Sequence, residues 1–585
     1  MGLSLVIPGT DKGGVVTYTI LSDGKTMPAT ISVSSIVTGK EANKIPYARL
    51  VLFDGEVAHA SSKPNFELSS GNDFKPGKKI TIKAGYSSKE KTIFEGVVVK
   101  QSVKHRSGKT SLLEVEIRDE AVKLTVGRKN KFFNNKLDSA IISSLLSGVK
   151  GVIEPTLLLH KQVIQYFSTD WDFILSRAEM NSKVVLVNDG KVSVKSPSLL
   201  GLPVLSLQYG VNVLEFDAEM DARTQFKSIV AQAYDGAKND SVKDKGKVIP
   251  PLVGGQGNIS SDELSKVIGL DQYLIQHGGN RTKPELKAAA DGKAIKAAFS
   301  KVRGSVKIEG TASVKPGDIV SFTGIGTRFS GNAYVSGVMH DISRGYWSTT
   351  IQFGLSFDWF GEENKINDVP AAAMVPAVRG LLIGIVAPFE QDPESNQRIK
   401  VTIPVVDRNE TVWARVGVFE AGTDHGFVFN PYEGDEVIIG FLNDDPRDPI
   451  ILGSLYSKKN KPFIPASSTN TKKGITTKKK LQLTFDDEKK VIEIKTPGGN
   501  MITISDDKKG ITIVDQNKNT IATSDKGITI DCAKDIKISA KGDISLEGKN
   551  VSLKAQSSFS ADGQSEAKVN SGSQTVIKGG IVKIN

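Results

Sequence analysis

Apolar and polar residues alternate along short stretches of the first 130 residues, and this period of two predicts β-strands with one buried face. The stretches lie at residues 15–20, 48–53, 79–84, 94–99 and 112–117. Gly, Asp and Pro separate them, as is typical of the turns between strands. We therefore expect an antiparallel barrel in this part of the chain.

The pattern changes after residue 135. Residues 136–150 and 168–182 have apolar positions at helical spacing, and in the second stretch Trp171, Ile174 and Leu175 fall on one face. Residues 237–260 predict a polar, Gly-rich loop, and residues 262–300 predict helix in pieces. Strand patterns surround these segments, at 183–187, 191–195, 226–233, 305–309, 318–322, 333–338 and 347–353.

A short repeat of paired aliphatic residues fills most of the last hundred positions. The first members of four successive pairs are 8, 8 and 7 residues apart, and the pairs are Ile528/Ile530, Ile536/Ile538, Ile544/Leu546 and Val551/Leu553. Similar pairs precede them at Ile502/Ile504 and Ile511/Ile513. A fixed short period predicts one strand and one turn in each repeat.

Two inward aliphatic side chains per strand would make only a thin core. Because a single coiled chain would exclude water poorly at that density, we expect three chains to wind around one another. A β-solenoid made by one chain is the alternative. The predicted trimer core consists of Ile511, Ile513, Ile528, Ile530, Ile536, Ile538, Ile544, Leu546, Val551 and Leu553.

Composition and charge narrow the chemistry of this 585-residue chain. Its net charge of +11 comes mostly from Lys in turns, without the platform of Arg and aromatic residues that nucleic-acid binding requires, so we expect no stable nucleic-acid partner. Lys at turns also protects strand edges from pairing with other molecules. The single cysteine and the six scattered histidines predict no catalytic residues, no metal site and no cofactor.

Several ordered motifs resemble a known family, the VgrG proteins of type VI secretion and the spike proteins of phage-tail-like contractile injection systems. Residues 170–177 (DWDFILSR) resemble the characteristic hub helix of that family, and residues 328–338 resemble a hub strand. Residues 379–456 resemble its OB-fold. The motif positions of this OB-fold are Trp413, Arg415, Gly434, Asp435, Pro446, Pro449, Gly453 and Tyr456, and Trp413 is expected in the core.

The resemblance implies a mainly β fold: two hub β-barrels with helical insertions, an OB-fold, and a C-terminal intertwined trimeric β-helix. The expected parts, in order, are hub barrel I (1–135), a hub segment of helices and strands (136–235), a loop and helical insertion (236–304), the completion of barrel II (305–375), the OB-fold (379–456), a linker (457–480) and a β-helical needle (481–585). Since the repeat runs to Asn585, we expect no effector domain after it.

The same resemblance implies a structural function. The chain is expected to form the homotrimeric spike of an injection machine, adapting a sixfold tube to a threefold needle and puncturing an envelope without catalysis. Expected partners are the tube protein and baseplate components, effector cargo, a membrane only during puncture, and a PAAR-type protein at the tip. The tip contact is expected at Ile581, Val582, Lys583, Ile584 and Asn585.

The first residues of the chain bear on where the protein is made. The first residues lack a basic segment followed by a long apolar stretch, so we expect synthesis in the bacterial cytoplasm without a signal peptide and delivery as part of a particle. The alternative function is a β-helical adhesin with a carbohydrate- or nucleic-acid-binding OB module. Type VI secretion and a released particle are not distinguished by the sequence.

Overall fold

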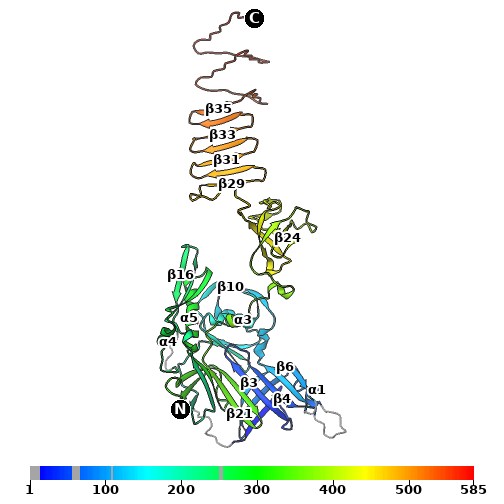
Figure 1. Ribbon diagram of the computed structural model, residues 1–585, viewed down its shortest axis with the longest axis vertical. Helices are drawn as coiled ribbons and strands as arrows, with labels where there is room; N and C mark the ends of the chain where they lie inside the picture. Colours follow the sequence, from blue (N-terminus) through cyan, green and yellow to red (C-terminus); the bar gives the residue numbers. More distant parts are fainter. Residues whose placement is uncertain (1–13, 56–65, 107–109, 249–254, 585) are drawn as a thin grey trace. The chain divides into compact units, whose positions relative to one another are not determined.

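A computed structural model describes residues 14–55, 66–106, 110–248 and 255–584 of the chain (Figure 1). The chain divides into two compact units, Met1–Ala373 and Met374–Asn585. The initial residues expected to lack a signal peptide and the last predicted tip residue, Asn585, lie outside the described residues.

One 13-stranded sheet forms the framework of the first unit. Strand β3 pairs antiparallel with β20, which joins the strands of the predicted first barrel to those of the second. In sheet order the strands are β14 (Glu215–Met220), β18 (Val302–Glu309), β21 (Tyr346–Phe353), β20 (Gly331–Ser343), β3 (Val33–Glu41), β4 (Tyr47–Phe53), β7 (Leu112–Arg118), β6 (Lys89–Lys104), β5 (Lys79–Tyr86), β1 (Val16–Ser22) and β2 (Lys25–Thr26), with β19 (Ile319–Thr323) and β13 (Leu205–Gln208) branching from β20.

Two hydrophobic cores correspond to the two predicted barrels. One packs Leu50 and Phe94 of the N-terminal strands together with Trp347 of β21. The other packs Phe322 and Phe353 between the strands of the C-terminal half. The two cores therefore lie on one continuous sheet, and β20 and β21 contribute residues to both.

Helices and short sheets cover this framework. Helix α3 (Asp170–Glu179) begins where the Thr169 hydroxyl accepts a hydrogen bond from the Asp172 amide, and Trp171, Ile174 and Leu175 are buried as the periodicity predicts. The other elements of this unit are α1 (Glu67–Ser70), α2 (Asp138–Leu145), α6 (Phe360–Glu363), β8 (Lys129–Leu137) paired with β10 (Leu159–Ser168), β9 (Lys150–Ile153) with β11 (Val184–Asn188) and β12 (Lys191–Lys195), and the 3-10 turns Glu120–Thr125, Ala222–Thr224 and Pro370–Ala373.

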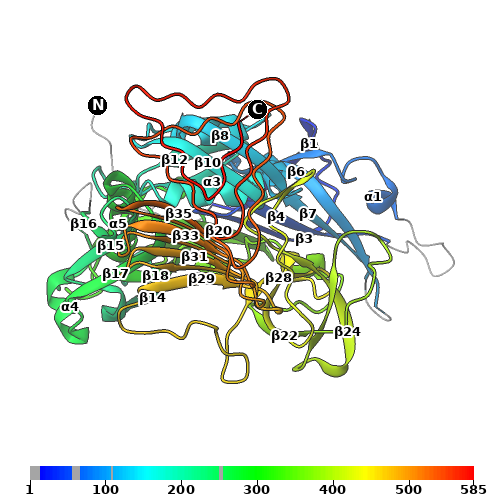
Figure 2. The same ribbon diagram turned by 90° about the horizontal axis from the view of Figure 1, so that it is seen from above.

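The segment predicted as helix in pieces over 262–300 contains a strand, which corrects that prediction. Helices α4 (Ser261–Ile268) and α5 (Lys283–Ser300) flank β17 (Gln272–Asn280), which lies parallel to β15 (Ser228–Asp235), and β16 (Asp240–Lys245) pairs on the other side. These elements lie together in both views (Figures 1 and 2). The strand has a period of two, since Tyr273 and Ile275 pack in the small cores beside α5 while Leu274 is exposed.

The second unit begins with a closed five-stranded barrel, which has the expected OB-like architecture. Val401, Val437 and Ile439 are fully buried in its core. In barrel order its strands are β22 (Leu382–Val386), β23 (Ile399–Ile403), β24 (Asp407–Val416), β28 (Pro449–Ser454) and β27 (Glu436–Phe441). The loop between β24 and β27 carries the small hairpin of β25 (Ala421–Gly422) and β26 (His425–Gly426), and Leu442–Asp444 is a 3-10 turn.

A seven-stranded antiparallel meander follows the barrel, each strand pairing with the next in sequence. Its strands are β29 (Lys472–Thr476), β30 (Gln482–Asp486), β31 (Val491–Lys495), β32 (Met501–Ser505), β33 (Gly510–Val514), β34 (Thr520–Ser524) and β35 (Gly527–Asp531). The sheet thus begins inside the predicted 457–480 linker, because Ile475 pairs with Leu483 and extends the alternating pattern upstream.

Candidate assembly surface

The meander presents one face of aligned apolar side chains. Antiparallel partners point to the same side of a sheet, so the register stacks the aliphatic residues in columns. One column consists of Ile475, Leu483, Ile494, Ile502, Ile513, Ile521 and Ile530. The second column contains Phe485, Ile492, Ile504, Ile511 and Ile528.

This apolar face has no cover within one chain. Apart from the half-buried Leu483, its side chains are between 38 and 74% exposed. The opposite face is polar or small along the central row of Gly474, Thr484, Glu493, Thr503, Thr512, Ala522 and Thr529. An ordered, uncovered apolar sheet face of this extent is typical of a surface that is buried on assembly.

Four of the ten predicted core residues belong to this face: Ile511, Ile513, Ile528 and Ile530. The aliphatic residues from Ile475 to Ile504 on the same face were left out of the predicted set. The longer turns between their strands, such as residues 487–490, break the period of eight. The alternation of apolar and polar residues within each strand is nevertheless a signal that predicts these positions.

The other six predicted core residues lie in 532–584, where the structure assigns no strand. They are Ile536, Ile538, Ile544, Leu546, Val551 and Leu553, and each is more than half exposed. The predicted strand pairs are therefore not formed within one chain, because a strand needs a neighbouring ladder and this segment makes none with itself. The described tip residues, Ile581, Val582, Lys583 and Ile584, are exposed as well.

The OB motif residues stabilise turns and outward surfaces of the barrel. Gly434 occupies the left-handed region at φ 83°, and Asp435 accepts a hydrogen bond from the Tyr432 amide at 2.8 Å. Pro449 is buried, Pro446 and Gly453 are half-buried, and Arg415 and Tyr456 are exposed.

The expectation that Trp413 lies in the core is wrong. Its neighbour Ala414 is the buried residue of β24, so Trp413 points outward. It is half-buried there, with Lys400 Nζ 5.2 Å from the centroid of its ring. The aromatic ring thus covers the barrel surface beneath a cation.

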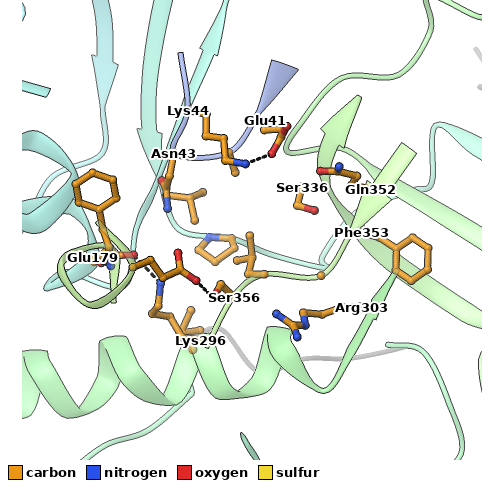
Figure 3. Close-up of a pocket in the computed structure, with 18 of the residues that line it drawn as sticks. Glu41, Asn43, Lys44, Glu179, Lys296, Arg303, Ser336, Gln352, Phe353 and Ser356 are labelled. Atoms are coloured by element: carbon orange, nitrogen blue, oxygen red, sulfur yellow. Dashed lines mark hydrogen bonds and ion pairs between the residues drawn. The ribbon is translucent and has the colours of Figure 1, made fainter. Parts of the chain in front are cut away.

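A cavity of about 770 Å³ lies in the first unit between the β3–β4 turn, α3 and α5 (Figure 3). Lys296 Nζ donates to Glu179 Oε1 at 2.6 Å, and Arg303 Nη2 lies 2.9 Å from Glu219 Oε1. The two other lysines of the lining are paired in the same way, Lys44 with Glu41 and Lys183 with Glu154. Since each cation already has a carboxylate partner, we assign no anionic ligand to the cavity.

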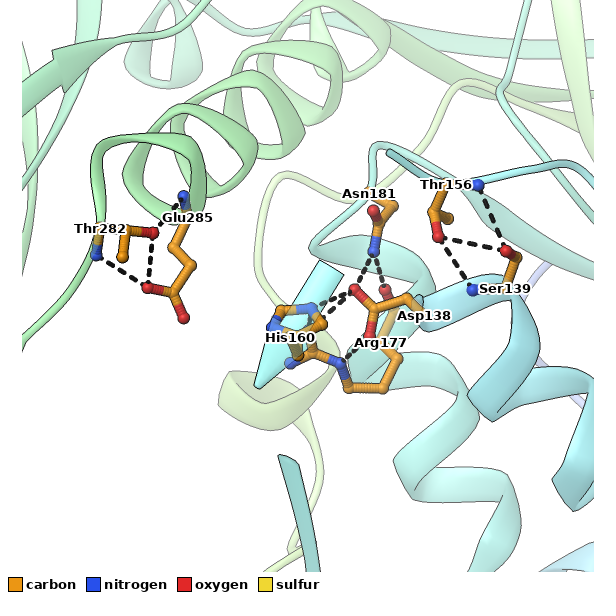
Figure 4. Close-up of polar contacts among 8 residues, drawn as sticks. All are labelled: Asp138, Ser139, Thr156, His160, Arg177, Asn181, Thr282 and Glu285. Atoms are coloured by element: carbon orange, nitrogen blue, oxygen red, sulfur yellow. Dashed lines mark hydrogen bonds and ion pairs between the residues drawn. The ribbon is translucent and has the colours of Figure 1, made fainter. Parts of the chain in front are cut away.

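A buried polar cluster joins α2, α3 and β10 (Figure 4). Arg177 donates to Asp138 from Nε at 2.6 Å and from Nη2 at 2.9 Å, and His160 Nε2 lies 2.8 Å from Asp138 Oδ2. Burial alone would raise the pKa of Asp138, but the hydrogen bonds from His160 and Arg177 hold it well below its usual range. This cluster stabilises the fold by satisfying a buried carboxylate.

The described ranges contain neither a candidate metal cluster nor a candidate membrane-spanning helix. No group of three or more His, Cys, Asp or Glu side chains there has an arrangement that could hold a metal ion. No helix among the same residues is long and apolar enough to cross a membrane.

Three protein families match the chain, in consecutive segments. The Alg8 N-terminal domain family matches residues 12–344, more than half of the chain. The type VI secretion system/phage-baseplate injector OB domain matches residues 382–456. The phage baseplate V C-terminal trimerisation domain matches residues 491–556, which include strands β31–β35 of the exposed apolar face.

Curated relatives are similar over short stretches. The actin cross-linking toxin VgrG1 of Vibrio cholerae is 36% identical over 106 residues, 16% of this chain and 10% of that protein. The type VI secretion system spike protein VgrG1c of Pseudomonas aeruginosa is 31% identical over 130 residues, 20% of this chain and 18% of that protein. The chain thus matches less than a fifth of the length of these relatives.

Solved structures give low overall similarity. A 43 kDa tail protein from a Shewanella oneidensis prophage aligns with a TM-score of 0.43 and 13% identity, covering 58% of this chain and 98% of that one. A tail protein from Neisseria meningitidis aligns with a TM-score of 0.42 and 12% identity, covering 59% and 98%.

The family assignment rests on the three family matches and their order. They confirm the resemblance expected from the sequence motifs. The chain belongs to the VgrG and phage-baseplate spike family.

Proposed function

We propose that three copies of the chain form the spike and hub of a contractile injection machine, with the meander and the segment after it as a trimeric needle. The observation that carries this proposal is the ordered apolar face of β29–β35, which one chain leaves uncovered. Three such faces turned towards a common axis would cover one another and form a closed three-sided prism. Burying each aliphatic side chain would contribute about 1.5–3 kcal/mol.

The needle would use two kinds of pairing. Strands β29–β35 hydrogen-bond to one another within a chain, so that only their side chains need the other copies. Residues 532–584 have no such ladder, and their backbone groups would pair between the three chains instead. The predicted core positions from Ile536 to Leu553 then belong to an intertwined β-helix.

In the assembled machine the trimeric hub would match a sixfold tube, and the needle would cross a target envelope during contraction. The tube protein and baseplate components would contact the hub, a PAAR-type protein would cap residues 581–585, and effector cargo is a further partner. Synthesis in the bacterial cytoplasm and later delivery in the particle fit this role. The division of the chain into parts is proposed with it, except that the needle begins at β29, inside the segment predicted as a linker.

The solution mass of the purified chain, before and after mild detergent without heating, tests the proposal. We expect a mass near three times the 62.9 kDa of one chain, and a trimer that survives the detergent. A monomer in both conditions would contradict the wound needle. Ligand binding by such a monomer would favour the β-helical adhesin instead.

A further inference from the structure

Residues 355–367 lead from the last strand of the hub towards the joint between the two compact units. They follow β21, which lies inside the 13-stranded sheet between β18 and β20. We call residues 355–367 the strap. Because a chain has one covalent connection between its two units, any force that passes along one copy from one unit to the other goes through the strap.

The middle of the strap closes over a buried lysine of α5. Lys293 Nζ lies 4.0 Å from the ring centroid of Phe357 and 5.1 Å from that of Trp359. Glu362 Oε2 lies 3.2 Å from the same Nζ and accepts the Trp359 amide at 2.7 Å. The Phe357 ring also packs against Tyr273, with centroids 5.4 Å apart. Lifting the strap from α5 would therefore break an ion pair and expose two aromatic rings to water.

A buried carboxylate ties the strap to α3 as well. Glu179 accepts the Phe360 amide on Oε2 at 2.7 Å and Lys296 Nζ on Oε1 at 2.6 Å. Because Glu179 is buried, both hydrogen bonds are charge-assisted and shielded from water. The packing here is close: a Cβ on Gly292 would lie 2.6 Å from the Glu179 carbonyl oxygen and 3.0 Å from the Trp359 ring. Helices α3 and α5 and the strap thus meet where no further side chain fits.

An arginine fastens the end of the strap. Arg128 Nη1 donates to the carbonyl oxygens of Ile366 at 3.3 Å and Asn367 at 3.0 Å. The same nitrogen donates to the Phe167 carbonyl at 2.9 Å, and the guanidinium lies over the Phe167 ring, 5.7 Å from its centroid. Arg128 directly precedes β8 and Phe167 belongs to β10. The β8–β10 hairpin therefore holds the last residues of the strap.

These attachments change which contacts a pull on the strap must break. Without them the pull would act on the end of β21 and open its ladders with β18 and β20 one hydrogen bond at a time. With them it acts on α5, α3 and the β8–β10 hairpin together, so several contacts must break at once. Such concerted breaking slows opening, and the opening rate governs resistance to force. We propose that the strap is a mechanical anchor, which transmits force between hub and needle without opening the hub sheet. This inference rests on the proposed function, in which contraction supplies the force.

Optical-trap pulling on the full-length protein tests the anchor. One copy of each trimer carries C532S with the attachment cysteines K75C, beside the fully buried Phe74 of the hub, and T411C, on β24 of the OB barrel. With the native strap we expect no separate release of this segment before the hub opens. In R128A/E362A we expect an early release of at most about 45 Å, the extended length of the strap at roughly 3.5 Å per residue.

The matched control is E116A/R118A, which removes another arginine–glutamate pair of the same unit, on β7. It should show no early release. Early release in the unmodified strap, in the control, or in none of the proteins would overturn the anchor and leave the proposed spike intact. A monomer in solution would contradict the spike instead, and the same pulling comparison on single chains would still decide the anchor.

Hydrogen exchange gives a second readout that needs no force. The Phe360 amide, bonded to Glu179, should exchange as slowly as the amides of β21 in the unmodified protein. In R128A/E362A it should exchange faster while β21 stays protected. A Phe360 amide that already exchanges as fast as an exposed loop in the unmodified protein would overturn the anchor.

Discussion

The hub and the needle bury their apolar residues in opposite ways. In the first unit, Leu50, Phe94, Trp347 and Phe353 are at most 2% exposed, within cores that one chain completes alone. In the described part of the second unit, no apolar side chain after Ile451 is buried. Both regions are made of β-strands with a period of two, so the alternation alone does not distinguish them.

The number of layers distinguishes the two regions. The hub sheet encloses two cores of its own, and α5 packs against it at β19 and β20. The meander is a single layer with no second layer from the same chain. Since a sheet needs its apolar face covered to be stable in water, we expect the proposed needle to be stable only when other copies cover that face, whereas the cores of the hub are complete within one chain.

Charges on the apolar face of the meander should have the largest effect. We expect I511D with I513D to prevent the trimer, because three copies would place six carboxylates in a dry core. Mass measurement with and without detergent reads out the result. The control is T512D, on the same strand but on the polar face, which should remain trimeric. Equal loss in both variants would mean that the apolar face is not the interface.

Charges farther along the needle should act on assembly without touching the meander. I538D with I544D places charges where one chain forms no ladder. We expect the loss of detergent resistance, since the intertwined segment can no longer exclude water. A fully resistant trimer in this variant would show that residues 532–584 contribute nothing to the wound core.

A substitution that leaves a cavity in the hub core should destabilise the hub without affecting the assembly of the needle. Trp347 packs against the Tyr86 ring at 5.4 Å and against Gly310, where even a Cβ would clash with the indole. We expect W347A to destabilise the hub by about 3–5 kcal/mol, through lost burial and the cavity left behind. Urea unfolding should show this for the hub transition while detergent resistance persists. Loss of the trimer instead would mean that the two folds are coupled.

Substitutions at Lys293, a buried lysine of the hub, should show whether one chain also supplies the partners of its buried charges. Its side chain is fully buried, with Nζ 4.0 Å from the Phe357 ring centroid and 3.2 Å from Glu362 Oε2. We expect K293M to change the free energy of unfolding by less than about 1.5 kcal/mol, because it keeps the volume. K293A should cost about 2–3 kcal/mol in the same urea titration. A larger effect of K293M than of K293A would mean that the charge, not the stem, stabilises the site.

Local pattern was enough to predict much of this molecule. The β class, the face of α3 and the aliphatic set from Ile511 to Ile530 were readable because each follows a simple period. The strand β17 was missed because its period of two runs over only a few residues between two helices. Trp413 was placed in the core because its size suggested burial, whereas its register with Lys400 puts it outside. The pairing of β3 with β20 joins residues 300 positions apart, which no local pattern encodes.

The smallest effect concerns a titration inside the hub. His340 is buried with Nδ1 3.0 Å from the Thr349 hydroxyl, and burial, with a further contribution from the charge of Lys40, lowers its pKa to about 3. An exposed histidine has a pKa of about 6.5. Between these values the unfolded chain binds a proton that the folded hub does not, so the free energy of unfolding should fall as the pH drops below about 6.5. The slope from this residue is at most about 1.4 kcal/mol per pH unit.

Urea titrations of the hub transition at pH 7 and pH 5 measure this slope, and H340F should reduce the difference in the free energy of unfolding between the two pH values. No histidine follows His425 in the sequence, so the needle contains none. Its detergent resistance should therefore not change between pH 7 and pH 5. A needle that dissociates at pH 5 while the hub is unaffected would reverse the comparison.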